Sequence, residues 1–345
     1  MVWCALRITS ASKVGTNNKD QEGNILMKIV FMETDTLGND VDLSIFDQIG
    51  EVIKYPSSNP LEDGNRVMDA DVIIVNKIPM NATILDGASK LKLICVTGTG
   101  TNIVDFSYTN GRNITVTNVR GYSTQSVVQH TFALFFYLYE KLSYYDQFVK
   151  SGEYIRSDIF SHFSITFNEL AGKTWGIIGL GDIGKGVCAV AEQFGCKVVY
   201  YSTSGKNANP DFERVDLDTL LCDCDVISIH APLNDATKDL IGEVELWKMK
   251  KSAILLNLGR GPIVNEHALA KALKEERIGG AGLDVLTVEP MAESNPLKDI
   301  QDSTRLIITP HIAWATVEAR QRVTGEVYQN IIAFQNGEER NVVRA

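Results

Sequence analysis

From Lys28 onward, the chain alternates between two spacings of its hydrophobic residues. Short continuous apolar runs predict buried strands, and stretches with an apolar residue at every third or fourth position predict helices. In the first part of the chain the predicted strands are 28–33, 51–54, 72–75, 93–96 and 114–117, with helices at 43–48, 61–68 and 82–87. Strands that alternate with helices in this way form a parallel sheet with helices on its faces.

A second alternation of strands and helices begins after a long helical stripe. This stripe, which includes Val127, Leu134 and Leu138, predicts one helix from about 123 to 150. The strands expected after it are 175–178, 197–201, 226–229, 254–257, 280–283 and 306–309, and the helices are 183–194, 217–222, 243–249, 265–276 and 314–335. Six strands of this type make a complete dinucleotide-binding domain.

The order of these elements predicts an α/β protein with two doubly wound parallel-sheet domains that flank a cleft. The last helix follows the final strand, so it can return to the first domain. We therefore expect a flavodoxin-like substrate domain over 28–122 and 313–345, and a Rossmann cofactor domain over 123–312. Residues 1–27 are polar and aperiodic over much of their length, which predicts a disordered extension.

Composition excludes several classes of function. The 345 residues are 44% apolar with a net charge of −10 and no block of Lys or Arg, which argues against a nucleic-acid partner. No apolar run approaches the ~20 residues that span a bilayer, so we expect no membrane association. The six cysteines are scattered, which is typical of reduced thiols in a cytoplasmic protein. Cys222 and Cys224 lack a second pair of ligand residues that would complete a metal site with them, so we expect no metal site.

The most informative stretch is a glycine turn between a strand and a helix. Gly179, Gly181 and Gly184 have the spacing G-x-G-x-x-G, directly after the strand at 175–178. Such a turn places backbone N–H groups and a helix N-terminus against a pyrophosphate, with Asp182 and Ile183 inside the same turn. Ordinary tight turns between a strand and a helix also contain glycines. In this chain, the strand before the turn and the helix after it favour a dinucleotide site.

Three ionisable residues follow three later strands. Arg260 comes after the strand at 254–257, Glu289 after 280–283, and His311 after 306–309. The carboxyl ends of parallel strands face one crevice, so these side chains and the glycine turn are expected on the same side of the sheet. Taken singly, each residue has a structural explanation. Arg260 could form a surface ion pair, Glu289 could belong to a turn, and His311 could be a buried structural histidine. Their joint placement favours a catalytic site.

These residue types suit the reduction of a ketone by hydride transfer. The reaction leaves negative charge on the carbonyl oxygen, and histidine is an acid suited to protonating it near neutral pH. A carboxylate beside the imidazole orients it and favours its protonated form. An arginine grips a substrate carboxylate through two parallel hydrogen bonds. We therefore expect His311 to act as acid and base, Glu289 to orient it, and Arg260 to bind the substrate.

With these residues in view, the chain from Lys28 onward resembles the D-isomer-specific 2-hydroxyacid dehydrogenases. The resemblance rests on the glycine turn and on the motifs GTGTN at 98–102, NVRGYST at 118–124, ELAGK at 169–173, HAPL at 230–233, NLGRG at 257–261, LDVLTVEP at 283–290 and TPHI at 309–312. It implies the catalytic roles given above for Arg260, Glu289 and His311. It also implies cofactor contacts for Asp284, His230 and Pro232.

The resemblance further implies a substrate loop and a homodimer. The loop of Gly98, Thr99 and Gly100 would offer backbone N–H groups to the substrate carboxylate. The motifs NKIP at 76–79, YST at 122–124 and QHT at 129–131 are most similar to the glycerate dehydrogenase and hydroxypyruvate reductase branch, in which Lys77 would lie near the substrate mouth. Dimerisation is expected through the helix that begins near Ser123.

The turn after the second cofactor-domain strand bears on the choice between NAD(H) and NADP(H). An NAD enzyme usually has Asp or Glu there, about 20 residues past the glycine turn, on the ribose hydroxyls. Ser202 occupies that position here, and Thr203 and Lys206 follow it. These residues can bind a 2′-phosphate that a carboxylate would repel. The sequence therefore favours NADP(H), although no arginine lies in the turn itself.

The expected substrate is a small 2-oxo acid, led by hydroxypyruvate and glyoxylate, and the product is a D-2-hydroxy acid. Lys77, Tyr122 and residues 160–163 are expected to set the size of the accepted acid, with His162 as an exposed loop residue. Two alternatives remain open at this point. One is oxidation of phosphite or formate on the same fold, and the other is a non-catalytic corepressor that senses dinucleotides.

Overall fold

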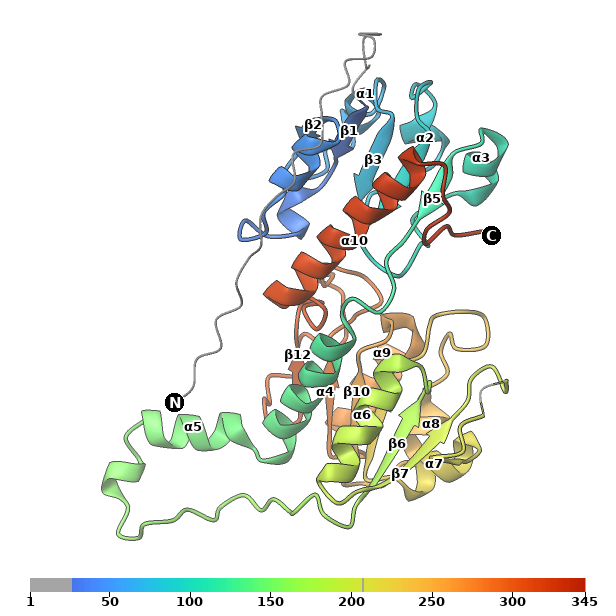
Figure 1. Cartoon of the computed structure of the whole chain (residues 1–345). Helices are drawn as coiled ribbons and strands as arrows, with labels where there is room; N and C mark the ends of the chain where they lie inside the picture. Colours follow the sequence, from blue (N-terminus) through green and yellow to red (C-terminus); the bar gives the residue numbers. More distant parts are fainter. Residues whose placement is uncertain (1–26, 207, 345) are drawn as a thin grey trace, which may run out of the picture.

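A five-stranded parallel sheet forms the first half of the molecule (Figure 1). The computed structural model describes residues 27–206 and 208–344. The strands of this first sheet are β1 (Lys28–Phe31), β2 (Glu51–Lys54), β3 (Val72–Val75), β4 (Leu93–Val96) and β5 (Thr115–Thr117), in the order β2-β1-β3-β4-β5. This is the flavodoxin-like order, which reverses direction between β1 and β3. Of the predicted extension 1–27, only Met27 lies within the described residues.

A seven-stranded parallel sheet forms the second half. Its strands are β6 (Thr174–Ile178), β7 (Lys197–Tyr201), β8 (Glu213–Arg214), β9 (Val226–Ile229), β10 (Ile254–Asn257), β11 (Gly280–Leu283) and β12 (Leu306–Ile308). The order β12-β11-β10-β9-β6-β7-β8 reverses between β6 and β9, where an open α/β sheet binds its ligand. The predicted class, two doubly wound α/β domains, is confirmed. β8 was not predicted, because two residues carry no recognisable alternation.

The helices cover the faces of the two sheets. They are α1 (Asp63–Arg66), α2 (Ala82–Leu85), α3 (Phe106–Gly111), α4 (Thr124–Tyr139), α5 (Leu142–Lys150), α6 (Asp182–Gln193), α7 (Leu217–Asp223), α8 (Glu243–Lys248), α9 (Glu266–Lys274) and α10 (Val317–Gln335). Short 3₁₀ turns lie at Thr34–Thr36, Ser44–Gln48, Tyr154–Arg156 and Gly261–Ile263. Within the described residues, none of these helices has the length and apolar character needed to cross a bilayer.

The single helix predicted over 123–150 is wrong. Lys141 adopts a left-handed backbone conformation with φ of +56°, which ends α4 and redirects the chain into α5. Its Nζ donates to the carbonyl of Thr304 at 3.0 Å. α4 buries one face against the seven-stranded sheet, whereas α5 buries no residue and projects from the body of the molecule (Figure 1). A non-glycine residue in this conformation leaves no signature in the hydrophobic pattern.

Helix α10 carries the end of the chain back to the first sheet. Its residues Ala319, Val323, Val327 and Ile331 are fully buried in the same core as β1 and β4. Each of the Val and Ile side chains contributes about 1.5–3 kcal/mol when it leaves water. Beyond α10, Val342 forms an antiparallel bridge with Thr117 at the β5 edge of the sheet.

Candidate active site and dinucleotide cradle

The glycine turn lies at the point where the seven-stranded sheet reverses. Gly179 follows β6 with φ of +95°, and a Cβ there would meet Ala231 N at 2.7 Å. A Cβ on Gly184 would lie 2.4 Å from the carbonyl oxygen of Gly179, so α6 packs closely on the turn. A Cβ on Gly181 would meet nothing within 4 Å. The turn is therefore closed on its protein side and open above Gly181, where α6 begins at Asp182.

Two buried polar side chains at the same edge lack partners among the described residues. Both ring nitrogens of His230, directly after β9, are buried without a hydrogen bond, and so is the Oγ of Ser202, directly after β7. Burial lowers the pKa of His230 to about 3, so its ring is neutral at ordinary pH. An unsatisfied buried polar group costs about 1–3 kcal/mol. These orphaned groups and the open turn fit a bound dinucleotide. Pro232, exposed at the same edge, is fixed through its carbonyl by Thr237 Oγ1 at 2.7 Å.

A cation that the sequence did not indicate reaches the turn after β7 from a separate strand. Gly205 N donates to Ser202 O at 3.1 Å, which closes the turn, while the side chains of Thr203 and Lys206 are half-buried and exposed. Arg214 reaches this turn from β8 and donates from Nη1 to the carbonyl of Gly205 at 3.0 Å. The pairing of β8 beside β7 is what brings it there, and that pairing was not predicted.

His311 and Glu289 form the central pair of the site. Nδ1 of His311 lies 2.7 Å from Oε2 of Glu289, and Oε1 of Glu289 accepts from the N–H of Leu286 at 2.9 Å. Burial alone would raise the pKa of Glu289. The hydrogen bonds from His311 and Leu286, with the charges of His311 and Lys77, outweigh it and hold this pKa below its usual value. The carboxylate is thus ionised and holds the imidazole in one orientation.

Asp284 holds the segment that carries His311. Its carboxylate is buried and accepts from Thr309 Oγ1 at 2.6 Å, from Ile312 N at 2.9 Å and from Ala313 N at 2.9 Å. The N–H of His311 donates to the carbonyl of Asp284, and His311 has φ of +55°. Sequence reasoning assigned Asp284 to the nicotinamide and did not foresee these bonds.

His130 extends this network from α4. Its Nε2 lies 2.9 Å from the hydroxyl of Thr309 and 3.6 Å from Oδ1 of Asp284. Burial lowers the pKa of His130, and the charge of Asp284 acts in the opposite direction. The network therefore ties α4 to the strand ends that carry the site.

Arg260 meets the glycine loop of the other sheet. A Cβ on Gly100 would lie 2.7 Å from Nη2 of Arg260, so only glycine leaves room for the guanidinium there. The loop itself is fixed on both sides, because Thr99 Oγ1 donates to Val119 O at 2.8 Å and Asn118 Nδ2 donates to Thr99 O at 2.7 Å. Arg260 Nη1 donates to the carbonyl of Gly259 at 2.8 Å.

Tyr122 adds a phenol beside the same loop. A Cβ on Gly98 would lie 3.9 Å from the Tyr122 hydroxyl. Burial raises the pKa of Tyr122 to about 12, and the charge of Arg260 opposes that shift. The phenol therefore keeps its proton at ordinary pH. The structure brings Gly98, Gly100, Tyr122 and Arg260 together.

Lys77 approaches the site from the end of β3, where the first sheet reverses. The N–H groups of Asn76, Lys77 and Ile78 all donate to Oε2 of Glu33, at 2.9, 2.8 and 3.2 Å. The charge of Lys77 is one of the causes that lower the pKa of Glu289. Glu33 fixes the backbone at Lys77, and the sequence did not indicate this contact because Glu33 lies 44 positions from Lys77.

Residues 160–163, which were expected to set the size of the accepted acid together with Lys77 and Tyr122, form no hydrogen bond or ring contact with either residue in the described part of the chain. They lie on the segment that follows α5. There the ring of His162 stacks on Phe148 with centroids 3.7 Å apart, and its Nε2 lies 2.8 Å from the hydroxyl of Tyr144. The expectation of an exposed histidine is wrong, since His162 is half-buried among the aromatic side chains of α5.

Comparison with known proteins points to one family. Residues 132–313 match the model described as D-isomer specific 2-hydroxyacid dehydrogenase, NAD binding domain. The chain is 40% identical to a glycerate dehydrogenase of Methylorubrum extorquens over 92% of this chain and 99% of that protein. It is 34% identical to a hydroxypyruvate reductase of Blautia hydrogenotrophica, with the same coverage of 92% and 99%.

Solved structures agree with these sequence relatives. An acyclic imino acid reductase in complex with NADPH and D-Arg superposes with a TM-score of 0.78 at 30% identity, covering 92% of this chain and all of that one. D-lactate dehydrogenase of Aquifex aeolicus, complexed with NAD and lactic acid, has a TM-score of 0.79 at 28% identity, covering 90% of this chain and 96% of that one.

Proposed function

Because this chain belongs to the D-isomer-specific 2-hydroxyacid dehydrogenases, we propose that it reduces hydroxypyruvate and glyoxylate to their 2-hydroxy acids at the site of Arg260, Glu289 and His311. It is a nicotinamide-dependent oxidoreductase of small 2-oxo and 2-hydroxy acids. The observations that carry the proposal are the 2.7 Å pair of His311 and Glu289 and the contact of Arg260 with the loop at Gly98 and Gly100.

The groups of this chain divide the reaction between them. When bound, the reduced nicotinamide supplies a hydride to the carbonyl carbon of the substrate. Arg260 and the N–H groups of the loop at Gly98, Thr99 and Gly100 hold the substrate carboxylate. The imidazolium of His311 gives its proton to the carbonyl oxygen, and Glu289 stabilises the positive charge on the ring before that transfer. In the reverse direction, neutral His311 accepts the proton from the hydroxyl group.

Lys77 supplies the substrate mouth with positive charge. Glu33 fixes the backbone of Lys77, and the charge of the Lys77 ammonium group acts on Glu289. A cation there favours acids whose far end is polar, such as hydroxypyruvate, over purely aliphatic ones. A spectrophotometric screen of 2-oxo acids with NADH and NADPH tests this assignment. Preference for a long aliphatic acid would contradict it.

The same screen distinguishes the other two functions. Oxidation of phosphite or formate without reduction of 2-oxo acids would indicate a different anion pocket. Tight dinucleotide binding without any turnover would indicate a sensor. The relatives named above favour the 2-oxo acids.

We also propose that NADP(H) is preferred over NAD(H). Ser202 stands where an acidic residue would repel a 2′-phosphate, and its buried hydroxyl lacks a partner among the described residues. Lys206 is exposed four residues further on. Replacing Ser202 with Asp is expected to shift the preference toward NAD(H). An unchanged ratio of kcat/KM for the two cofactors would refute this assignment.

We propose that residues 28–122 and 313–345 form the substrate domain and residues 123–312 the cofactor domain. The chain crosses between the two sheets near Tyr122 and near Ile312, so these crossings are the expected hinges. Such a cleft is expected to close around cofactor and substrate. Small-angle scattering with NADPH and a 2-oxo acid analogue should give a smaller radius of gyration than the apoprotein gives.

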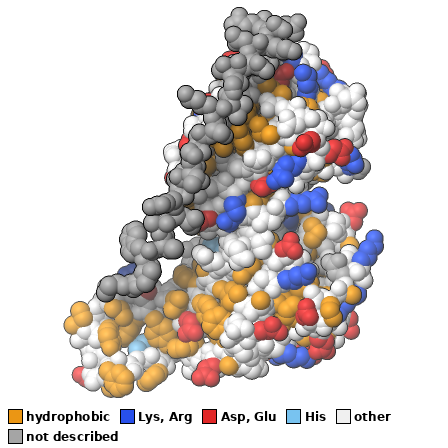
Figure 2. Space-filling model, in the orientation of Figure 1, with side chains coloured by type: hydrophobic (Ala, Val, Ile, Leu, Met, Phe, Trp, Pro, Cys, Tyr) orange, Lys and Arg blue, Asp and Glu red, His pale blue; other side chains and the backbone are white. Residues whose placement is uncertain are grey.

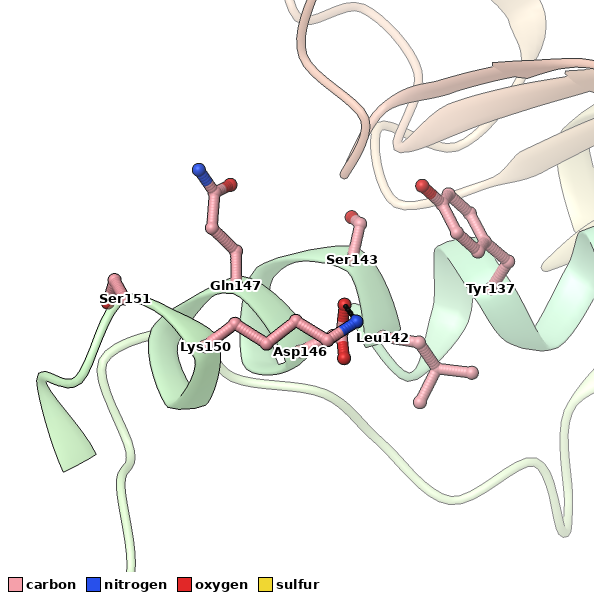
Figure 3. Close-up of a pocket in the computed structure, with 7 residues that line it drawn as sticks. All are labelled: Tyr137, Leu142, Ser143, Asp146, Gln147, Lys150 and Ser151. Atoms are coloured by element: carbon pink, nitrogen blue, oxygen red, sulfur yellow. Dashed lines mark hydrogen bonds and ion pairs between the residues drawn. The ribbon is translucent and has the colours of Figure 1, made fainter. Parts of the chain in front are cut away.

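We propose a homodimer that covers the arm formed by α5 and the segment after it. Apolar side chains gather there (Figure 2), and Val149, Ile155, Phe160 and Phe163 are 53%, 88%, 90% and 78% exposed. A groove of about 740 Å³ runs along the length of α5, from Tyr137 to Ser151 (Figure 3). Exposure on this scale is typical of a surface that a second copy covers. Light scattering should give the mass of a dimer, and Phe160→Asp should weaken it.

A cytoplasmic location is proposed on the state of the thiols. The described cysteines are all free, and Cys95, Cys188, Cys196 and Cys224 are buried. Free buried thiols fit a reducing compartment. Cell fractionation with an antibody against the protein tests this location.

A further inference from the structure

We propose that Arg214 binds the 2′-phosphate of NADP(H) and so determines cofactor specificity together with Ser202. The inference deepens the proposed function, on whose preference for NADP(H) it rests. It assigns the choice of cofactor to a residue on a separate strand, outside the turn that follows β7.

The strand pairing places Arg214 at the ligand-facing edge of the sheet. β8 lies parallel to β7 at the end of the sheet, with Arg214 in register with Tyr200. Two residues after Tyr200, the chain leaves β7 at Ser202 and turns back at Gly205. Arg214 therefore lies beside the turn at which a Rossmann domain holds the adenosine ribose.

The guanidinium of Arg214 already reaches the turn. Its Nη1 donates to the carbonyl of Gly205 at 3.0 Å, and among the described residues no carboxylate forms an ion pair with it. The neighbouring Glu213 is engaged with Lys197, at 2.9 Å. A guanidinium has five N–H donors, so most of those on Arg214 remain for a phosphate. The bond to Gly205 fixes the fork, which lowers the entropy that binding would cost.

The second observation is the Oγ of Ser202. This side chain is 4% exposed and its hydroxyl has no partner among the described residues. A hydroxyl at the end of β7 and a guanidinium anchored over the same turn form a donor pair for an anion. The exposed ammonium of Lys206 adds positive charge. A ribose with two free hydroxyls would gain little from this charge, whereas a 2′-phosphate pairs with it directly.

Binding of cofactor fragments tests the inference without any turnover. Calorimetry with adenosine 2′,5′-bisphosphate and with ADP compares the two ligands on the wild type, Arg214→Ala and Lys274→Ala. Loss of a charged hydrogen-bond partner should lower the affinity of Arg214→Ala for the 2′,5′-bisphosphate roughly 10- to 100-fold. The affinity for ADP should change by less than about twofold, because Arg214 is proposed to contact only the 2′-phosphate. Lys274→Ala removes a cation at an exposed position in the last turn of α9, away from Arg214 and Glu213, and should change the affinity for neither ligand.

Equal weakening of both ligands by Arg214→Ala, or no weakening of either, would overturn the role of Arg214. The wild-type ratio of kcat/KM for NADPH and NADH tests the proposed preference separately. A wild type that prefers NADH, with a selective loss of the 2′,5′-bisphosphate in Arg214→Ala, would refute the preference and support the inference. A wild type that prefers NADPH, combined with an Arg214→Ala variant that shows no selective loss of affinity for the 2′,5′-bisphosphate, would support the preference and refute the role of Arg214.

Discussion

Nδ1 of His311 lies 2.7 Å from Oε2 of Glu289, although the two residues are 22 positions apart in the sequence. They reach each other from the loops that follow β12 and β11. Asp284 fixes the first of these loops by accepting from Ile312 N and Ala313 N. The pair is therefore set by the backbone before any substrate arrives, as a preorganised acid requires.

Replacing His311 with Ala should lower kcat by about two to four orders of magnitude, the range over which general acid–base catalysis contributes. Binding of the cofactor should change little, because no part of the glycine turn is altered. Steady-state kinetics with hydroxypyruvate give the first value, and fluorescence titration with NADPH gives the second. His267→Ala, at an exposed position of α9, is the matched control. Near-normal turnover in His311→Ala would exclude the proposed acid.

Glu289→Gln should shift the acid limb of hydroxy-acid oxidation to lower pH. Burial alone would raise the pKa of Glu289, but its bond to His311 helps to hold this pKa below its usual value, so the wild-type residue is a carboxylate near neutral pH. Gln keeps the shape of the side chain but removes the negative charge that faces the imidazole of His311. Since oxidation needs the neutral ring, activity should extend downward by about one pH unit.

The pH profile of kcat for oxidation, measured for both proteins, checks this direction. The alkaline limb of the reduction reaction should move downward as well, because reduction needs the protonated ring. A limb that stays in place, or moves to higher pH, would mean that Glu289 does not act through His311.

Most of the fold could be predicted because parallel strands buried on both faces are continuous apolar runs. The predicted strand at 226–229 coincides with β9, and that at 93–96 with β4. The break at Lys141 and the strand β8 were missed, because neither a left-handed lysine nor a two-residue strand changes the hydrophobic periodicity.

The candidate site divides in the same way. Arg260, Glu289 and His311 could be proposed because each follows a strand, and strand ends share one edge; their catalytic roles stay predictions. Glu33 and Arg214 could not, since they depend on contacts with Lys77 and Gly205 that no local pattern encodes. Such contacts appear only once the register of the strands is known.

Gly100→Ala should damage substrate binding selectively. The added Cβ would lie 2.7 Å from Nη2 of Arg260, so the guanidinium must move away from the position in which we propose that it holds the substrate carboxylate. We expect KM for the 2-oxo acid to rise by about tenfold or more, as for other small displacements of a positioning group. The Kd for NADPH should not change.

Gly325→Ala is a matched control for this substitution. Gly325 lies inside α10, where a Cβ would meet nothing within 4 Å. Because alanine is favoured over glycine in a helix, this variant should be stabilised by about 0.5–1 kcal/mol with unchanged kinetics. Normal KM in Gly100→Ala would show that Arg260 does not need its present place.

Glu33→Ala should act on the substrate through Lys77. The carboxylate of Glu33 accepts three consecutive N–H groups at 76–78, and without it the loop loses its anchor. We expect KM for hydroxypyruvate to rise to a similar extent in Glu33→Ala and in Lys77→Ala, with little change for glyoxylate, which has no far hydroxyl. Glu33→Gln keeps one acceptor oxygen and should recover part of the loss. Additive effects in the double variant would separate the two residues and contradict the link.

Removing the buried imidazole of His230 should make the apoprotein less sensitive to acid. Burial lowers its pKa to about 3, whereas a histidine in the unfolded chain has a pKa near 6.5. Between these values the unfolded state binds a proton that the folded state does not, so the folded state loses stability as the pH falls below about 6.5. At pH 5 this loss amounts to about 2 kcal/mol relative to pH 7.5.

Urea unfolding at the two pH values checks this expectation. Gln at position 230 does not titrate, so between pH 7.5 and pH 5 His230→Gln should lose about 2 kcal/mol less of its free energy of unfolding than the wild type loses. His267→Gln, at an exposed position, should behave as the wild type does. An equal loss in the wild type and in His230→Gln would mean that the ring of His230 is not kept neutral by its surroundings.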